Sequence, residues 1–185
     1  MLKRIKANWK RWTLELLAIL AIVAAVGAWQ ARGLTEGASP PLQGVRTDGV
    51  AVNLAESLKV SPGGTASEPK AGAGGPLLVD FWATWCPVCN VEEVNIERVA
   101  RHWPVISVAI QSGDAAAVSK HLRERDIALP AVVDSDGRIA ANWRVRGMPT
   151  HFIVDADGNI RFRVVGYATT LGLMLRLWWA GAVPA

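Results

Sequence analysis

Cysteine is scarce in this sequence: Cys86 and Cys89 are the only two cysteines among 185 residues. A scaffold held together by several disulfides is therefore excluded, and any disulfide within the chain must join these two residues across a CxxC spacing. Histidine is scarce as well. The three histidines, His102, His121 and His151, show no paired ligand spacing that would complete a zinc site with the CxxC, so we expect no metal.

A surplus of positive charge is absent from most of the chain. The net charge is +4, and residues 1–30 hold five Lys or Arg against one Glu, which accounts for the whole surplus. The rest of the chain is electrically balanced and offers no general attraction for a polyanion. We therefore exclude nucleic acid as a partner.

An apolar run close to membrane-spanning length occurs near the N-terminus, where residues 14–29 are apolar except for Glu15. Because about 20 apolar residues cross a bilayer and tryptophans suit its interfaces, we predict a single transmembrane anchor over residues 12–30. The basic residues of 1–11 predict a cytoplasmic tail, which places the remainder outside the cytoplasm. Two alternatives stay open: a buried core helix, and a cleaved signal peptide, which bulky Trp29 at the expected cleavage site disfavours.

Two segments rich in Gly and Pro divide the rest of the chain. Residues 31–49 lack periodicity and predict a linker, so that the folded domain would cover residues 50–185. A short strand is expected over 50–54. Residues 61–76 predict an exposed, mobile loop.

Strand and helix patterns alternate through the remaining sequence and then end in a hairpin. This order predicts an α/β fold with a mixed sheet covered by helices on both faces. The last helical run is interrupted by Arg176, so we expect it to pack on the sheet and not to form a second membrane helix. Strands are expected at 76–82, 104–110, 129–134, 148–155 and 160–167, and helices at 90–102, 114–126, 136–143 and 169–181.

The CxxC stands between a predicted strand and a predicted helix. Cys86 would then lie at the helix N-terminus, where backbone N–H groups and the helix dipole favour a thiolate. Pro87 suits the first helical position because it has no N–H to leave unpaired. We predict an exposed, activated Cys86 that forms a mixed disulfide and a Cys89 that resolves it. A zinc half-site and an inert thiol pair are the alternatives.

Asp80 is an acid within an apolar strand, six residues before Cys86. A buried acid there must stay protonated or find a partner, and it could exchange a proton with Cys89. The alternative is an edge-strand aspartate that faces solvent. Pro149 follows Met148 before an apolar strand and could be cis or trans. His151, two residues beyond Pro149, could approach the site, but we expect a surface histidine or one with satisfied hydrogen bonds.

The segments VDFWATWCPVC and VRGMPTHFIVDADGNIRFRVVGY resemble the thioredoxin superfamily, specifically the membrane-anchored TlpA, ResA and DsbE (CcmG) branch, and short suppressor-of-copper-sensitivity D-type proteins. The resemblance covers roughly residues 40–180 and implies a thioredoxin-like fold. It implies that Cys86 is the nucleophile, Cys89 the buried resolving thiol, Pro149 a cis-proline beside them and Asp80 the buried acid. The surface that meets a substrate would include Trp85, Pro87, Val88, Met148 and Thr150.

The resemblance also implies an activity and partners. It favours a reductase of selected exported proteins, such as apocytochrome c or a copper-handling protein, with no cofactor besides the disulfide. A membrane electron donor resembling DsbD or CcdA would reduce the Cys86–Cys89 disulfide again after each reaction. The protein would be a monomer anchored in the bacterial inner membrane, with its folded domain in the periplasm. Net disulfide oxidation or isomerisation, and a copper carrier that uses the dithiol as a soft ligand pair, stay open.

Overall fold

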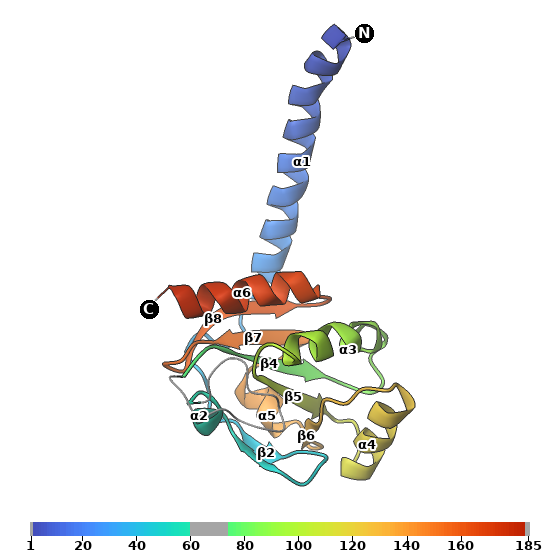
Figure 1. Ribbon diagram of the computed structural model, residues 1–185, viewed down its shortest axis with the longest axis vertical. Coiled ribbons are helices and arrows are strands. Elements are labelled where there is room, and N and C mark those ends of the chain that lie inside the picture. The colour runs from blue at the N-terminus through green and yellow to red at the C-terminus, as the bar shows by residue number, and fades with distance from the viewer. Residues whose placement is uncertain (1, 60–73, 184–185) are drawn as a thin grey trace. The chain divides into compact units, whose positions relative to one another are not determined.

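The structure, a computed structural model, describes residues 2–59 and 74–183, except for the side chains at 2–11, 20, 23, 24 and 28 (Figure 1). The chain forms two compact units, Met1–Arg32 and Gly33–Ala185. Most of the loop predicted over 61–76 lies outside the described residues.

The first unit consists of one helix, α1 (Leu2–Gln30). Its described apolar side chains, among them Trp12, Leu17, Ile22 and Trp29, are exposed. In the described part of the chain, no helix combines the length and the apolar character that crossing a bilayer requires. The transmembrane anchor over 12–30 stays a prediction.

The second unit is built on a mixed sheet with the strand order β1-β8-β7-β4-β5-β6. Strands β4, β5 and β6 run parallel, whereas β7, β8 and β1 are joined by antiparallel pairing. Strand β4 lies inside the sheet and all its residues are buried, which explains its nearly continuous apolar sequence. The bounds are β1 (Gly37–Ala38), β4 (Leu77–Trp82), β5 (Val105–Ile110), β6 (Ala131–Asp134), β7 (Thr150–Val154) and β8 (Asn159–Val165).

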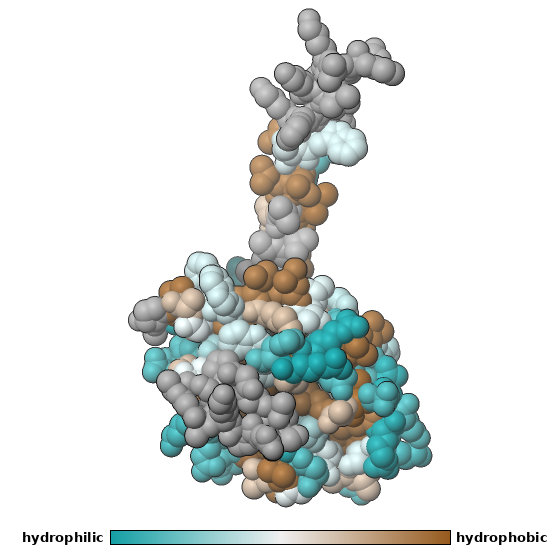
Figure 2. Space-filling view, viewed as in Figure 1, coloured by the Kyte–Doolittle hydropathy of each residue, from teal (hydrophilic) through white to brown (hydrophobic). Residues whose placement is uncertain are grey.

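Three helices cover one face of this sheet (Figure 1). Leu78 of β4 shares an apolar cluster with Val99 of α3 and Leu173 of α6, and Trp82 shares another with Val118 of α4. The outer side of α4 is hydrophilic in Figure 2, as its sequence predicts. The helices are α3 (Pro87–Ala100), α4 (Ala115–Glu124) and α6 (Thr170–Ala182).

The opposite face carries an aromatic cluster and a small hairpin. Trp143, which follows α5, lies with its ring centroid 5.6 Å from that of Phe81 and 4.9 Å from that of Phe152. The hairpin lies so close to β6 that a Cβ on Gly44 would stand 2.4 Å from a methyl group of Val132. The elements on this side are α5 (Arg138–Asn142), β2 (Gln43–Val45), β3 (Ala51–Asn53) and α2 (Leu54–Ser57).

The prediction of a linker over residues 31–49 is wrong, and this is the main correction to the predicted organisation. Strand β1 joins the edge of the main sheet by pairing with β8, and β2 pairs with β3. Leu34 and Leu42 are 4% and 1% exposed, so this segment supplies part of the core. The folded unit therefore begins near Gly33 and not at residue 50. The predicted mixed sheet, with helices on both faces, is confirmed.

Candidate active site at the Cys86–Cys89 disulfide

Cys86 and Cys89 form a disulfide at the N-terminus of α3, with their Cα atoms 5.3 Å apart. Cys86 is the N-cap residue of the helix, and its sulfur accepts a hydrogen bond from the Cys89 backbone N–H at 3.2 Å. Pro87 occupies the first turn, where its missing N–H costs nothing. The position therefore offers a Cys86 thiolate both a backbone donor and the positive end of the helix dipole.

Neighbouring loops fix the segment that leads into the disulfide. The Cys86 N–H donates to the carbonyl of Ala83 at 3.1 Å, which closes a tight turn after β4. The Thr84 N–H donates to Ser112 Oγ at 3.0 Å, and Trp85 Nε1 donates to the carbonyl of Gln111 at 3.2 Å. The loop after β5 thus holds the cysteine turn in place.

The expected exposure of Cys86 is not found in the disulfide form. Cys86 is only 5% exposed and Cys89 2%. The reason is that the Cys86 side chain turns back to cap the helix and joins the apolar cluster of Cys89 and Ala83, against which Met148 packs. The exposed surface beside it comes from Trp85, at 59%, and Val88, at 44%, together with exposed Pro87.

Pro149 is buried and follows a cis peptide bond from Met148. Its carbonyl accepts a hydrogen bond from the Gly166 N–H at 2.8 Å. Thr150 requires a correction, because its side chain is fully buried and its hydroxyl donates to the carbonyl of Gly147 at 2.7 Å. The Thr150 side chain therefore secures the proline turn and cannot face a substrate directly.

Asp80 is 4% exposed and belongs to a strand inside the sheet, so the solvent-facing alternative is wrong. Its register partners are His151 on β7 and Ser107 on β5, which form a polar row across the sheet under α3. Ser107 accepts a hydrogen bond from Trp82 Nε1 at 2.7 Å.

His151 is the partner of Asp80; it is fully buried, so the expected surface histidine is wrong, and the alternative that it approaches the site holds. Its Nδ1 lies 3.0 Å from Asp80 Oδ1, and its Nε2 lies 3.2 Å from Glu92 Oε1. Both contacts are ion pairs and not aligned hydrogen bonds. All three side chains are buried. Burial by itself lowers the pKa of His151, but the two carboxylates outweigh it and raise that pKa from 6.5 to about 9.

Glu92 was also missed, although one signal was available in the sequence. It stands three residues after Cys89 on α3, which places both side chains on the same side of the helix. Glu92 is 1% exposed and accepts a hydrogen bond from the Ala168 backbone N–H. The site thus contains a second buried acid beside the expected one.

A cavity of about 20 Å³ lies against Cys89, Asp80 and Glu92. This volume is that of about one water molecule, and the polar groups around it can bind one. Glu93 also lines the cavity, but it is paired with His121 at 2.7 Å and with Arg125. In the described part of the chain, no group of three or more His, Cys, Asp or Glu is arranged to hold a metal.

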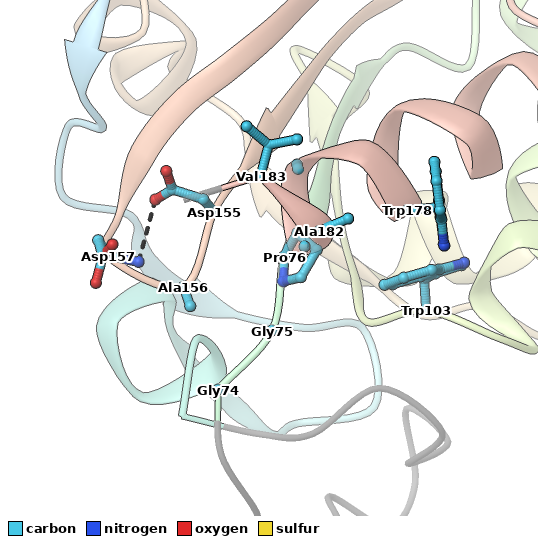
Figure 3. A pocket seen from close by; sticks show the side chains of 12 residues that line it. Gly74, Gly75, Pro76, Trp103, Asp155, Ala156, Asp157, Trp178, Ala182 and Val183 are labelled. Carbon is cyan, nitrogen blue, oxygen red and sulfur yellow. Dashed lines mark hydrogen bonds between the residues drawn. The ribbon is translucent and has the colours of Figure 1, made fainter. Parts of the chain in front are cut away.

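A larger hollow of about 460 Å³ opens at the other end of β4 (Figure 3). Pro76, which precedes β4, lines it together with Trp103 and Trp178. The cysteines follow the opposite end of the same strand. None of the predicted site residues lines this hollow.

A mixed sheet, a disulfide at the N-terminus of a covering helix and a cis-proline whose preceding residue, Met148, packs against the cysteine cluster define a thioredoxin-like protein. The AhpC/TSA family model matches residues 54–163, more than half of the chain. A thioredoxin-like protein of Haemophilus influenzae is 31% identical over 125 residues, which cover 67% of this chain and 74% of that protein. The chain belongs to the AhpC/TSA family.

Other relatives carry the names of the branch that the sequence resembles. The thiol:disulfide interchange protein DsbE of Pseudomonas aeruginosa is 37% identical over 94 residues, which cover 50% of this chain and 52% of that protein. The thiol-disulfide oxidoreductase ResA of Bacillus cereus is 27% identical, over 57% of this chain and 64% of that protein. The match with DsbE thus spans about half the length of that relative.

Solved structures support the fold. A thiol:disulfide interchange protein of the thioredoxin family from Chlorobium tepidum superposes with a TM-score of 0.61 at 20% identity, covering 79% of this chain and 97% of that one. A secreted disulfide oxidoreductase of Mycobacterium tuberculosis superposes with a TM-score of 0.58 at 20% identity, covering 75% of this chain and 95% of that one. The thioredoxin-like fold is confirmed.

Proposed function

We propose that this protein is a thiol:disulfide oxidoreductase that reduces disulfides of selected exported proteins. One observation carries the proposal: the Cys86–Cys89 disulfide caps α3 and lies in an apolar cluster with Met148, next to cis-Pro149. Relatives named thiol:disulfide interchange protein and thiol-disulfide oxidoreductase support it.

The reaction proceeds in two exchange steps. In the reduced protein the Cys86 thiolate attacks one sulfur of a substrate disulfide, which breaks the substrate S–S bond and releases one substrate thiolate. Cys89 then loses its proton and attacks Cys86 Sγ, which releases the second substrate thiolate and closes the Cys86–Cys89 disulfide. Two electrons pass from the cysteine pair to the substrate, whose two thiolates take up protons.

The Cys89 proton needs an acceptor because Cys89 is buried. Asp80 and Cys89 line the same small cavity, so one water molecule there would connect the thiol to the carboxylate. Asp80 therefore serves as general base when the disulfide closes and as general acid when it opens. No cofactor besides the disulfide is needed for these steps.

A substrate meets the site from the exposed side of the disulfide. Trp85, Pro87 and Val88 offer exposed, mostly apolar surface there, and partly buried Met148 packs against the cluster that contains the cysteines. The substrate contributes the disulfide-bearing segment, which must lie close enough for its sulfur to reach Cys86. The chain needs no second copy for this geometry, and we expect a monomer.

We further propose that residues 12–30 anchor the protein in the bacterial inner membrane, with the cytoplasmic tail at 1–11 and the folded unit in the periplasm. The apolar run, the flanking tryptophans and the basic residues before them support this topology. A membrane donor resembling DsbD or CcdA then supplies electrons. An apocytochrome c or a copper-handling protein is the substrate that the resemblance favours.

Alkylation trapping in intact cells tests the direction of electron flow. Rapid acid quenching followed by thiol alkylation reports the resting state of Cys86 and Cys89. A reductase predicts a mostly reduced pair that becomes oxidised when its membrane donor is deleted. A pair that rests mostly oxidised would instead assign net disulfide oxidation, while Cu(I) binding without any disulfide exchange would assign a carrier.

A further inference from the structure

The reaction described above uses Asp80 but leaves two buried titratable residues without a role. His151 is fully buried, and Glu92 is 1% exposed. His151 lies between the two acids, with one ring nitrogen 3.0 Å from Asp80 and the other 3.2 Å from Glu92. Glu92 and Asp80 share the cavity with Cys89, whereas His151 does not line it.

Two buried acids at one site do not both ionise readily. Each carboxylate is poorly solvated, and each negative charge disfavours the other. A cation placed between them removes this conflict. His151 occupies that place, and the carboxylates on both sides of the ring favour its protonated form.

We propose that His151 is a positioning residue for the exchange reaction: held as an imidazolium between Asp80 and Glu92, it keeps both carboxylates ionised beside Cys89. The inference rests on the proposed function and adds a residue to it. Its consequence is that the cluster accepts the Cys89 proton at a lower pH than two facing acids would on their own.

The balance of charge supports this role. With both acids ionised and His151 protonated, the cluster carries one negative charge. Uptake of the Cys89 proton by a carboxylate makes the cluster neutral as the Cys89 sulfur attacks Cys86. When the disulfide opens again, the same proton returns to Cys89. His151 keeps its own proton in both directions.

The groups around His151 leave this arrangement intact. Of the residues packed against the cluster, Ser107 on β5 is neutral, and the Ala168 N–H donates to Glu92. Glu93 on α3 is the nearby third acid; it forms an ion pair with Arg125, and His121 Nε2 on α4 lies 2.7 Å from it. The ring of His151 thus faces the two carboxylates and no cationic side chain among the described residues.

The test is a stopped-flow reaction of the reduced full-length protein with excess 5,5′-dithiobis(2-nitrobenzoate). The first release of thionitrobenzoate depends on reagent concentration and reports Cys86. The second release does not depend on it and reports attack by Cys89 on the mixed disulfide. A Cys89→Ser variant identifies the second phase by abolishing it.

The pH profile of that second phase decides the proposal. We expect the midpoint of this pH profile in His151→Asn to lie at least one pH unit above the wild-type midpoint. At a pH below both midpoints, each unit of that shift lowers the rate of the second phase about tenfold relative to the wild type. His102→Asn, which changes an exposed histidine, keeps the wild-type profile. An unchanged midpoint in a folded His151→Asn protein would overturn the proposal.

A second measurement needs no substitution at His151. Long-range nitrogen–proton NMR correlations of the wild-type protein distinguish an imidazolium from a neutral ring, and we expect His151 to be an imidazolium between pH 6 and 8. A neutral ring at pH 7 would overturn the proposal even if His151→Asn does not fold. Failure of the proposed function looks different, because the wild-type cysteine pair would then show no second phase.

Discussion

His151 and Asp80 stand directly opposite each other across the antiparallel strands β7 and β4, with Nδ1 of the histidine 3.0 Å from Oδ1 of the aspartate. The register of β7 against β4 makes this contact, because it places His151, two residues after Pro149, opposite the buried Asp80. The cysteines that exchange disulfides therefore lie at the N-terminus of α3, whereas Asp80 and His151 lie on the sheet beneath that helix.

The raised pKa of His151 makes stability depend on pH. Because the folded-state pKa is about 9 against 6.5 in the unfolded chain, the stabilisation is fully present below pH 6.5 and is lost as the pH rises through 9. We expect the free energy of unfolding of the oxidised protein to fall by up to about 3 kcal/mol across this window. Urea unfolding at pH 6, 7, 8 and 9 measures it.

His151→Asn is the variant that isolates this contribution. The difference in unfolding free energy between the wild type and His151→Asn should shrink steadily as the pH rises, because only the wild type loses a proton from the imidazolium. A difference that stays constant over the same range would show that His151 does not titrate as described.

Substitution of Asp80 tests the proton transfer directly. Asp80→Asn keeps the size of the side chain but removes the carboxylate beside the cavity, so we expect disulfide exchange at neutral pH to slow by about a hundredfold. Rates measured over several pH values should also lose part of their pH dependence. Asp157→Asn, in an exposed turn, is the matched control. Equal rates for Asp80→Asn and the wild type would remove Asp80 from the reaction.

The role of Thr150 is separable from substrate binding. Its hydroxyl is buried and donates to the Gly147 carbonyl at 2.7 Å, so Thr150→Val leaves that carbonyl without its partner. We expect a loss of about 1 to 2 kcal/mol in unfolding free energy. The KM for a protein disulfide should stay near the wild-type value, whereas Trp85→Ala on the exposed surface should raise it. A raised KM in Thr150→Val alone would reverse this assignment.

Residues 33–49 belong to the folded unit, and two apolar positions test this. Leu42 is 1% exposed, whereas Val45 in the neighbouring strand is 57% exposed. Leu42→Ala should therefore cost about 2 to 5 kcal/mol in unfolding free energy, and Val45→Ala should cost less than about 0.5 kcal/mol. Similar small losses for both variants would restore the view of this segment as a linker.

The sequence predicts the second unit well wherever local pattern decides the structure. The buried run of β4, the CxxC at the start of α3 and the Asp-Gly turn between β7 and β8 follow from residue type and spacing. Strand β1 escaped prediction because two residues, Gly37 and Ala38, carry no periodicity, and their pairing with β8 is a tertiary contact.

The same distinction applies to the site. Cys86, Cys89 and Asp80 could be selected from their place along one strand and one helix. The pairing of His151 with Asp80 and Glu92 required the register of β7 against β4 and the position of α3 above it. Thr150 was misassigned because the turn points its hydroxyl to Gly147, which no spacing rule reveals.

The central claim is that Cys86 and Cys89 carry out thiol–disulfide exchange with separate roles, and single-cysteine variants test it most directly. With a disulfide-bonded protein such as insulin, Cys89→Ser should accumulate a mixed disulfide through Cys86, visible by mass spectrometry, because the resolving thiol is gone. Cys86→Ser should accumulate little or none, since Cys89 is buried. No mixed disulfide with either variant, or equal amounts with both, would contradict the account.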